Sequence, residues 1–519
     1  MKSDFRKKDL PTGRQASLPA RQVSLPARQA YYLTTTLPYV NDRPHIGHAL
    51  EFVQADVVAR YKRLQGYDVI LNFGTDEHGQ KIYKKALESG KEPQAYVDEY
   101  AATFDELKQV LNFSFDNFIR TTDPAHKEAA REFWRICLKH DDIYKQAYKV
   151  KYCVGCELEK TDSELTNNIC PLHPNREIEV RDEENYFFRL SKYTEALSKL
   201  YEERPDFVIP AFRLNEIKTL IKEEGLKDFS ISRLKEKMPW GIPVPDDESH
   251  IMYVWFDALI NYISTIGWPK DMDTFKKYWV DTGGVVQFAG KDQVRQQAAM
   301  WQAMLMSANL PPSKQIIIHG FIVGEGGIKM SKSLGNGVDP FEVVKEYGTD
   351  ALRYFLLRHI HPFEDSEFTM DKFKEAYNAD LVNGLGNLVS RVMRMFVDAK
   401  LELHEEEKRK INEEFFKELD HGNFYTNGFD NYNLNHSMDY IWDIIKSVDK
   451  VITDNQPFKL IKSDSSKDKE RAVKDILFAV AQLDFIAMLL EPLLPETSGK
   501  IKDLINNHKF PETPLFPRK

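Results

Sequence analysis

Apolar and polar residues follow two different patterns along the chain, and each pattern predicts a different kind of structure. Residues 31–37 form a β-branched and aromatic run that is typical of a buried strand. A helix is predicted next, because apolar residues recur at helical spacing: Leu50, Val53, Val57, Tyr61 and Leu64. Gly66 can end this helix, and residues 69–73 read as a second strand. Strand, helix and strand in this order predict a parallel sheet with its ligand at the carboxyl edge.

The same pattern returns after a long interval. Residues 285–288 and 315–319 read as strands, with a helix over 292–307 between them. A nucleotide-binding sheet that is split by a long insertion is therefore the economical layout. From about residue 384 the strand patterns disappear, and long amphipathic helices predict a helical bundle to the end of the chain.

The first 30 residues read as separate from the fold. Ser-Leu-Pro-Ala-Arg-Gln occurs at 17–22 and again at 24–29. A proline in each copy excludes a continuous helix or a central strand. Because the segment is basic and poor in apolar residues, we expect a disordered tail.

Composition narrows the class of protein only a little. Hydrophobic residues at 42% and charged residues at 29% are ordinary for a globular protein. No apolar run approaches the roughly 18 residues of a membrane span, and no apolar signal core begins the chain, so we expect a cytoplasmic protein. A net charge of −9 does not exclude nucleic acid, because local basic patches decide such binding.

Three of the four cysteines lie in a pattern typical of zinc binding. Cys153-x-x-Cys156 is followed, after thirteen residues, by Cys170-x-x-His173. Three thiolates and an imidazole can surround Zn²⁺ tetrahedrally, and with all four positions filled the metal is expected to be structural. Cys137 falls in an apolar helical run and is predicted to be a buried core thiol.

A histidine loop joins the first predicted strand to its helix. His45 and His48 are three residues apart at the helix start, where the dipole and free N–H groups favour a phosphate. Gly47 has no side chain, so a flat base or ribose can lie against the backbone. Taken alone, the loop also fits two surface histidines at a helix start.

A lysine loop follows the strand at 315–319. Gly324, Gly326 and Gly327 predict a mobile strip, and Lys329 and Lys332 supply two ammonium groups suited to a departing pyrophosphate. The spacing does not match a Walker A loop. Solvated lysines on a glycine-rich loop are the alternative interpretation.

Together these motifs resemble the HIGH and KMSKS signatures of class I aminoacyl-tRNA synthetases, and the chain from about residue 31 resembles the methionyl-tRNA synthetases. Besides the two loops and the knuckles, the resemblance rests on five segments: 37–41, 74–79, 184–188, 253–258 and 290–292. It implies ATP-dependent activation of methionine to methionyl-adenylate, then transfer to the 3′ ribose of tRNA(Met). Mg²⁺ would accompany the ATP.

The resemblance also implies a domain order. A Rossmann-like α/β catalytic domain with a parallel sheet would be split by a connective insertion that carries the zinc knuckle. A stem-contact region and an all-α anticodon-binding bundle would follow. The expected ranges are a tail at 1–30, catalytic halves at 31–114 and 226–323, a connective domain at 115–225, the lysine loop and stem-contact region at 324–383, and the bundle at 384–519.

Site residues follow from the same resemblance. Catalytic roles fall to His45, His48, Lys329 and Lys332, and ATP contacts to His45, Gly47, His48, Gly290, Asp292 and Lys332. The methionine pocket would consist of Leu37, Tyr39, Asp76, Trp255, Ala258, Tyr262 and Gln297. Asp76 would pair with the substrate ammonium, and aromatic walls favour a thioether. Core packing for the aromatic residues and a turn role for Asp76 are the alternatives.

The chain departs from the family pattern at two places. Gln296 and Gln297 stand where a Phe-His pair is usual, and a buried glutamine needs hydrogen-bond partners. We favour a polar pocket contact for Gln297. Asn387 and Arg391, four apart on one helix face, match the anticodon-reading pair, while Phe458 stands where tryptophan is usual and can still stack on a base.

Other interpretations remain open at this point. Synthetases for isoleucine, valine and leucine carry a large editing domain for which the interval has no room, and cysteine enzymes use an open zinc site. A small nucleotidyltransferase would lack the helical bundle. A non-catalytic or altered-specificity paralogue that binds tRNA is suggested only by Gln296 and Gln297. ATP, methionine and tRNA are the expected partners, with no membrane, and we expect a monomer because the chain stops at Lys519 without a dimerising module.

Overall fold

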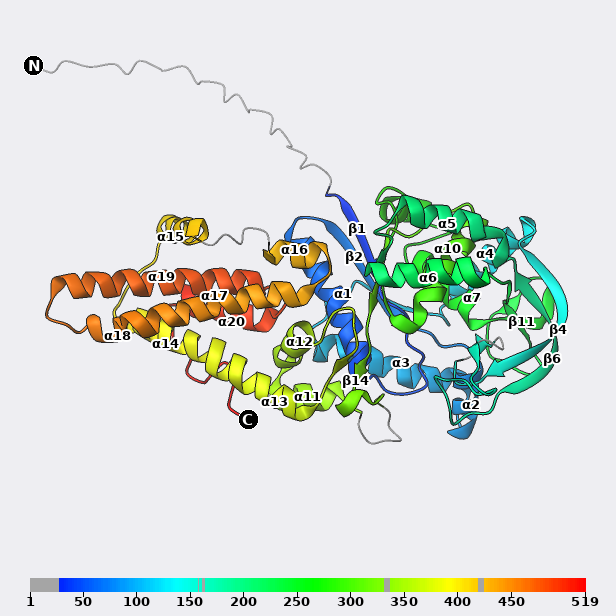
Figure 1. Cartoon of the computed structure of the whole chain (residues 1–519), viewed down its shortest axis with the longest axis horizontal. Helices are drawn as coiled ribbons and strands as arrows, with labels where there is room; N and C mark the ends of the chain where they lie inside the picture. The colour runs from blue at the N-terminus through cyan, green and yellow to red at the C-terminus, as the bar shows by residue number, and fades with distance from the viewer. Residues whose placement is uncertain (1–27, 157, 161–163, 331–336, 419–423) are drawn as a thin grey trace, which may run out of the picture.

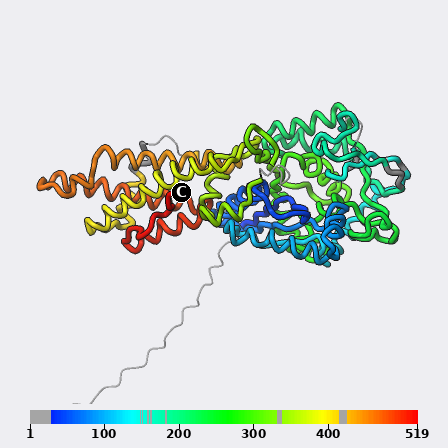
Figure 2. Tube along the Cα trace, turned by 90° about the horizontal axis from the view of Figure 1, so that it is seen from below, coloured from blue at the N-terminus to red at the C-terminus, as the bar shows by residue number. Residues whose placement is uncertain are grey.

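The computed structural model describes residues 28–156, 158–160, 164–330, 337–418 and 424–519. Most of the repeat-bearing tail, and Lys332 of the lysine loop, therefore lie outside the described residues. Figure 1 shows an α/β half and a helical half joined end to end, and Figure 2 shows the same elongated arrangement from below.

A parallel sheet forms the centre of the α/β half. Its strand order is β3-β2-β1-β12-β13-β7, and every pairing is parallel. The chain order reverses between β1 and β12, where Leu33 pairs with Val286. The predicted split sheet is thus confirmed, and the reversal places a crevice at the carboxyl edge of β1 and β12. The strands are β1 (Ala30–Thr34), β2 (Asp68–Thr75), β3 (Asn117–Arg120), β7 (Val208–Ile209), β12 (Val286–Gly290) and β13 (Gln315–His319).

Helix α1 (Ile46–Leu64) connects β1 to β2 and is buried along most of its length. Four of its five predicted apolar positions pack into the core, whereas Leu64, in the last turn, is 54% exposed. Gly66 follows with φ of 87°, a conformation that suits glycine after a helix end. The buried residues of α1 also include Glu51 and Asp56, which the structure uses as carboxylate partners for distant segments. Helices α2 (Gln80–Glu88), α3 (Pro93–Val110) and α4 (Pro124–Lys139) follow, and α4 carries the buried Cys137.

The long insertion is built on antiparallel strands. One sheet has the order β5-β4-β6-β8 and a second has β10-β11-β9. The cysteine knuckle lies at the end of β4. β3 and β7 fall within 115–225, the range expected for the connective domain, but they pair with the central sheet. The expected domain boundaries stay predictions. The elements are β4 (Ile143–Cys153), β5 (Leu158–Glu159), β6 (Glu179–Phe188), β8 (Phe229–Ser230), β9 (Ser232–Leu234), β10 (Pro243–Val244), β11 (Asp247–Met252), η2 (Leu190–Tyr193), α5 (Thr194–Glu203) and α6 (Ala211–Glu224).

The chain then returns to the central sheet through short helices. The helix predicted over 292–307 is present, but its first half is irregular: the 3₁₀ turn η4 (Lys291–Gln293) leads into the π-helix η5 (Gln296–Met300) and then α10 (Trp301–Ser307). π-helical turns are frequent at functional sites. The other elements here are α7 (Val254–Leu259), α8 (Asn261–Ser264), α9 (Met272–Phe275) and the π-helix η3 (Lys276–Val280).

Beyond β13 the described structure is mainly helical, with only the short strands β14 (Ile322–Val323) and β15 (Ser366–Glu367). No strand occurs in the described residues after Glu367, as predicted, and none of the described helices is long and apolar enough to cross a membrane. The helices are η6 (Glu325–Gly327), α11 (Pro340–Tyr347), α12 (Thr349–Arg358), α13 (Met370–Ala376), η8 (Tyr377–Gly386), α14 (Asn387–Asp398), α15 (Glu405–Glu418), α16 (Phe424–Asp430), α17 (Leu434–Asn455), α18 (Pro457–Leu460), α19 (Ser466–Leu490) and α20 (Pro495–Asn506).

A buried arginine links the two halves. Arg353, on α12, is fully buried and forms an ion pair with Asp56 of α1 at 2.9 Å. Its guanidinium also donates to the carbonyl oxygens of Leu111 at 3.0 Å and Leu493 at 2.8 Å. Leu493 lies between α19 and α20, so one side chain connects the histidine-loop helix to the bundle.

Candidate active site and metal centre

Two histidine rings stack at the start of α1. His45 is the N-cap, and its Nδ1 accepts a hydrogen bond from the Gly47 N–H at 3.1 Å. The Nδ1 of His48 accepts one from the His45 N–H at 3.2 Å, and the ring centroids are 3.7 Å apart. Because each Nδ1 acts as an acceptor, each neutral ring carries its proton on Nε2. The loop therefore offers two N–H donors beside the helix dipole, an arrangement suited to an anion.

The pKa of His48 supports this neutral form. Burial, followed by the neighbouring rings of His45 and His319, lowers the pKa of His48 well below its ordinary value. His48 is therefore an uncharged hydrogen-bond donor at neutral pH. The effect of His319 also shows that the end of β13 lies beside the histidine loop.

His319 and Glu51 form a buried pair at the same edge of the sheet. His319 Nε2 lies 2.9 Å from Glu51 Oε2, and its Nδ1 lies 2.7 Å from the carbonyl oxygen of Gly320. Each ring nitrogen therefore faces an acceptor oxygen, which favours the doubly protonated ring. Burial opposes this charge, but the hydrogen bond and charge of Glu51 outweigh burial and raise the pKa of His319. The other Glu51 oxygen accepts from the N–H and hydroxyl of Thr36, both at 2.7 Å.

Sequence reasoning missed this pair. His319 is the last residue of the predicted strand at 315–319, so its position at a carboxyl edge was a usable signal. Glu51 gave no such signal, because a lone glutamate in an amphipathic helix normally faces solvent.

Gly290 and Asp292 lie where β12 ends. A Cβ on Gly290 would stand 2.8 Å from Asp292 Oδ1, so the carboxylate closely approaches this glycine. Burial raises the pKa of Asp292, while the charges of His319 and Lys329 oppose the rise. The charge of Lys329 therefore reaches the same edge as the histidine loop.

The described part of the lysine loop turns on two glycines. Gly326 and Gly327 have φ of 69° and 76°, which side-chain-bearing residues rarely adopt. The Gly326 N–H donates to Glu367 at 2.8 Å, and Lys329 forms a β-bridge with Val323. Lys332 lies outside the described residues, so only the first lysine of the motif can be located.

The predicted methionine-pocket residues come from three segments. A parallel β-bridge joins Tyr39 to Asp76, with the Asp76 N–H donating to the Pro38 carbonyl at 2.9 Å. The rings of Tyr39 and Trp255 meet edge to face with centroids 6.3 Å apart. Leu37 is half-buried, and Asp76, Trp255, Ala258 and Tyr262 are buried. The structure thus brings Tyr39, Asp76 and Trp255 together.

A buried carboxylate connects the segments that carry these residues. Asp257 lies between His78 Nδ1 at 2.6 Å and His126 Nε2 at 2.8 Å, and His126 Nδ1 reaches the Ser264 hydroxyl at 2.9 Å. Burial alone would raise the pKa of Asp257, but the charge of His78 and the hydrogen bonds of both histidines lower it to about 2. The sequence gave no signal for His126, which is more than 100 residues from its partners.

Gln297 has the partners that a buried amide needs. It is 1% exposed, and its Nε2 donates to the Tyr262 hydroxyl oxygen at 2.8 Å. Its Oε1 accepts from Gln287 Nε2 at 3.0 Å. The neighbouring Gln296 is also buried, but its Oε1 has no hydrogen-bond partner among the described residues.

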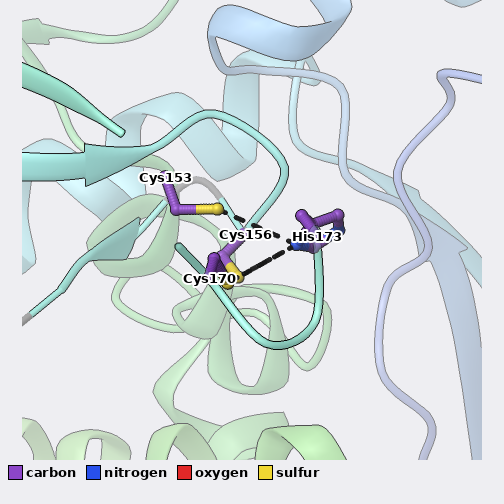
Figure 3. Close-up of side chains that lie close together, drawn as sticks. All are labelled: Cys153, Cys156, Cys170 and His173. Carbon is purple, nitrogen blue, oxygen red and sulfur yellow. Dashed lines mark hydrogen bonds between the residues drawn. The ribbon is translucent and has the colours of Figure 1, made fainter. Parts of the chain in front are cut away.

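The three knuckle sulfur atoms and the His173 ring face one another between two loops (Figure 3). The ligand atoms all lie within 4.8 Å of one another; Cys156 Sγ is 3.4 Å from Cys170 Sγ and 3.3 Å from His173 Nδ1. A tetrahedral zinc ion with Zn–S bonds of about 2.3 Å separates its ligand atoms by about 3.5–3.8 Å. The cluster therefore fits zinc. A Cβ on Gly155 would lie 2.4 Å from the His173 ring, so the loop requires glycine there.

The knuckle lies close to Lys329, the described lysine of the lysine loop. Burial, followed by the charges of Lys329 and Lys81, lowers the pKa of His173 to about 4. The imidazole is thus neutral at pH 7, as a metal ligand must be. Arg295, beside the π-helix η5, also forms an ion pair at 3.4 Å with Glu164 of the knuckle region.

The three residues expected to read the anticodon lie on the helical half. Asn387 begins α14 and is exposed, and Arg391, one turn later, forms an ion pair with Asp449 of α17 at 2.7 Å. Phe458, on α18, is 40% exposed. Exposure leaves these side chains available to a ligand, and their role stays a prediction.

Comparison with known proteins gives a consistent result. The family model described as tRNA synthetases class I (M) matches residues 31–177 and 155–393. The methionine–tRNA ligase of Thermotoga maritima is 40% identical over 481 residues, covering 91% of this chain and 74% of the relative. That of a Synechocystis species is 40% identical over 488 residues, covering 91% and 88%.

Solved structures agree with the sequence relatives. The Mycobacterium tuberculosis methionyl-tRNA synthetase in complex with methionyl-adenylate superposes with a TM-score of 0.85 at 34% identity, covering 94% of this chain and 100% of that chain. The apo form of the same synthetase superposes with a TM-score of 0.78 at 32% identity, covering 95% of this chain and 98% of that chain. With relatives of this similarity along nine-tenths of its length, the chain belongs to the methionine–tRNA ligase family of class I tRNA synthetases.

Proposed function

We propose that this chain activates methionine with ATP and transfers it to the 3′ end of tRNA(Met), for the initiation and elongation of translation. One observation carries the proposal most strongly. The histidine loop, Asp292, His319 and the charge of Lys329 gather at the sheet edge where the strand order reverses. Relatives at 40% identity are named methionine–tRNA ligases.

The first step needs no protein base. The ionised methionine carboxylate attacks the α-phosphate, an O–P bond forms, and the bond to pyrophosphate breaks with its electrons leaving on pyrophosphate. The protein supplies position and charge. We assign the Nε2–H groups of His45 and His48 to phosphate oxygens and the Gly47 backbone to the nucleoside. We assign Gly290 and Asp292 to the ribose or adenylate.

The lysines have separate roles in this proposal. Lys332 stabilises the charge that grows on the leaving pyrophosphate, and Lys329 holds the loop closed over it. Mg²⁺ accompanies the ATP and neutralises part of the phosphate charge. The support is the position of Lys329, whose charge acts on both Asp292 and His173.

Methionine would enter beside the nucleotide. Asp76 pairs with its ammonium group, and the side chain lies against Leu37, Tyr39, Trp255 and Ala258, with Tyr262 and Gln297 at the far end. The contact of Tyr39 with Trp255 and the bridge from Tyr39 to Asp76 support this arrangement. Aromatic walls around a polarisable thioether are favourable.

The knuckle would bind one structural zinc ion per chain through Cys153, Cys156, Cys170 and His173. Bound zinc would fix the two loops beside Lys329.

The bundle would bind the anticodon through Asn387, Arg391 and Phe458. The four cysteines form no disulfide, which supports a reducing compartment such as the cytoplasm.

Amino-acid-dependent exchange of pyrophosphate into ATP tests the activity. We expect methionine to stimulate exchange, and charging of tRNA(Met) to follow when tRNA is added. Stimulation by a different amino acid would instead indicate an altered-specificity paralogue. No stimulation by any amino acid, from folded and zinc-loaded protein, would contradict the proposal and favour a tRNA-binding paralogue.

A further inference from the structure

A turn of exposed residues leads directly into Lys329. Val323 and Lys329 pair antiparallel across this turn, and the Gly324 N–H donates to the Ile328 carbonyl oxygen at 2.7 Å. Residues 325–329 are all exposed, and the Ile328 side chain is 55% exposed. Apolar packing therefore does not hold the turn. Its shape depends on polar contacts, because its two glycines at positive φ leave the backbone many other conformations.

Glu367 supplies such a contact from 41 residues further along the chain. Its Oε1 accepts a hydrogen bond from the Gly326 N–H at 2.8 Å. The glycine turn (residues 324–328) thus has a charged acceptor at its tip. Hydrogen bonds to a charged group are stronger than those between neutral groups, so this contact is suited to hold one conformation of the backbone.

Two neighbours fix the position of Glu367 itself. Strand β15 pairs in parallel with β14, with Glu367 opposite Val323, and the Phe368 N–H donates to the Val323 carbonyl oxygen at 2.9 Å. The second carboxylate oxygen forms an ion pair with Lys372 of α13. The hydrogen bond and charge of Lys372, followed by the Gly326 N–H, lower the pKa of Glu367, so its carboxylate is ionised at neutral pH.

The conformation of the turn matters because it sets where Lys329 lies. The charge of Lys329 acts on the pKa of Asp292, at the sheet edge where β12 ends. A different turn would move the Lys329 ammonium group relative to Asp292. Misplacing a group by about 1 Å can cost up to about a hundredfold in the rate of a reaction that depends on it.

We infer that Glu367 is a positioning residue for the activation reaction, because it holds the glycine turn and thereby keeps Lys329 near Asp292. The inference rests on the proposed function, in which Lys329 belongs to the site of the departing pyrophosphate. Glu367 itself contacts no substrate in this account. The alternative interpretation is a surface ion pair with Lys372 that does not affect the turn, and such pairs contribute little.

Hydrogen exchange measured by mass spectrometry tests the contact without any substrate. Glu367→Ala should speed exchange at the Gly326 amide about tenfold, because its N–H loses the acceptor. Glu367→Gln should speed it by less than about threefold, since the amide oxygen can still accept the hydrogen bond. Lys372→Met removes the ion pair but leaves the carboxylate, so its exchange should match that of the unmodified protein. Unchanged exchange in Glu367→Ala would overturn the inference.

Methionine-stimulated exchange of pyrophosphate into ATP tests the effect on the reaction. Glu367→Ala should lower kcat about tenfold while the KM for methionine stays within about twofold, because the turn acts on the phosphate side of the site. Glu367→Gln should recover most of the rate. A fall in kcat at constant KM, with recovery in Glu367→Gln, distinguishes positioning from a loss of folded protein. An unchanged kcat in Glu367→Ala would contradict the positioning role.

Glu364→Ala is the matched control, because Glu364 is an exposed acid on the same segment. Its kcat should stay within about twofold of the unmodified protein. An equal fall in Glu364→Ala would attribute the effect to the loss of negative charge, and an equal fall in Lys372→Met would attribute it to the ion pair. Either result would overturn the inference. If methionine stimulates no pyrophosphate exchange in the unmodified protein, the proposed function fails instead.

Discussion

Asp257 illustrates how one buried side chain can connect several segments beside the proposed methionine pocket. It has no exposed surface, and it holds His78 beside Asp76 and His126 on α4. A lone carboxylate would be neutral at such a position, because burial disfavours charge. The two histidines keep it ionised. Its charge therefore ties α7 to α4 and to the segment that follows β2.

Acid should release this connection. The folded-state pKa of Asp257 is lowered from 3.8 to about 2, so its stabilisation is fully present above about pH 4 and is lost as pH falls through about 2. We expect this group to contribute about 2 kcal/mol to the fall in unfolding free energy over that window. Urea unfolding at several pH values should show a shallower fall in Asp257→Asn.

An exposed aspartate provides the comparison. Asp281→Asn should follow the pH dependence of the unmodified protein, because Asp281 is at the surface. If Asp257→Asn lost stability with acid as steeply as Asp281→Asn, the pairing with the histidines would not be the source of the effect.

At the residue scale, local motifs were predictable and distant partners were not. The positions of His45 and His48 followed from the change of strand to helix, and the metal ligands followed from their spacing. The partners of Gln297 did not, because Gln287 and Tyr262 meet it only through the order of strands in the sheet. His126 gave no signal for the same reason.

Among the elements, the zinc knuckle is the most local device. Its four ligands come from two short loops, and Gly155 lets the His173 ring approach the backbone. Little apolar surface is available there, since Ile169 and Leu172 are exposed. Metal bonds would therefore hold the loops in place of a core.

One zinc ion per chain is expected by mass spectrometric metal analysis. Cys170→Ala and Gly155→Ala should both lower the zinc content, the first by removing a ligand and the second by pushing a methyl group against His173. Cys137→Ala is the control and should keep its zinc, because Cys137 is a core thiol of α4. A metal-free preparation that is fully active would contradict the ligand assignment.

A second element-scale prediction concerns α14. Arg391→Ala should raise the KM for tRNA about tenfold while methionine-dependent exchange without tRNA stays unchanged. The ion pair with Asp449 is partly exposed, so its loss should cost under about 1 kcal/mol of stability. Arg394→Ala, on the same helix, removes an arginine that lies over the Phe510 ring and should leave the tRNA KM unchanged. Equal effects of both variants would exclude a specific role for Arg391.

Element type was predictable from periodicity, but irregular turns were not. The helix over 292–307 was expected to be regular, whereas the structure begins it with a 3₁₀ turn and the π-helix η5. A spacing of three or four residues cannot distinguish these forms over so short a span. The wider π-helical turn begins at Gln296 and Gln297, the two positions where the sequence is predicted to depart from the family pattern.

For the whole molecule, Arg353 is a buried polar connection between its two halves. It contacts Asp56 of α1, Leu111 after α3, and Leu493 of the bundle. Because α1 begins at the histidine loop, the bundle is tied to the helix that carries the candidate active site. A buried charge with this many partners is costly to leave incomplete.

Replacing Arg353 should therefore have a large effect. Arg353→Met leaves Asp56 and two carbonyl groups without this partner, and we expect it to lower the unfolding free energy by about 3–5 kcal/mol. Urea unfolding measures this. Arg471→Met, on an exposed part of α19, should change stability by less than about 0.5 kcal/mol. Similar values for both would show that Arg353 does not hold the halves together.

The split sheet was predictable from sequence because its strands are strongly apolar and the pattern resumes after the insertion. The joint between the halves was not, since nothing near Arg353 in the chain indicates Asp56 as its partner. Long-range ion pairs depend on the complete packing of both halves.

The pairing of β1 with β12 also has a consequence for how the protein is made. Val286 leaves the ribosome about 250 residues after Leu33, which at roughly 5–20 residues per second is a delay of about 10–50 s. For that time one side of β1 has unpaired backbone groups on an apolar strand, a template for association with other chains. The yield of active enzyme in a cell therefore depends on whether β12 or a neighbouring nascent chain reaches that edge first.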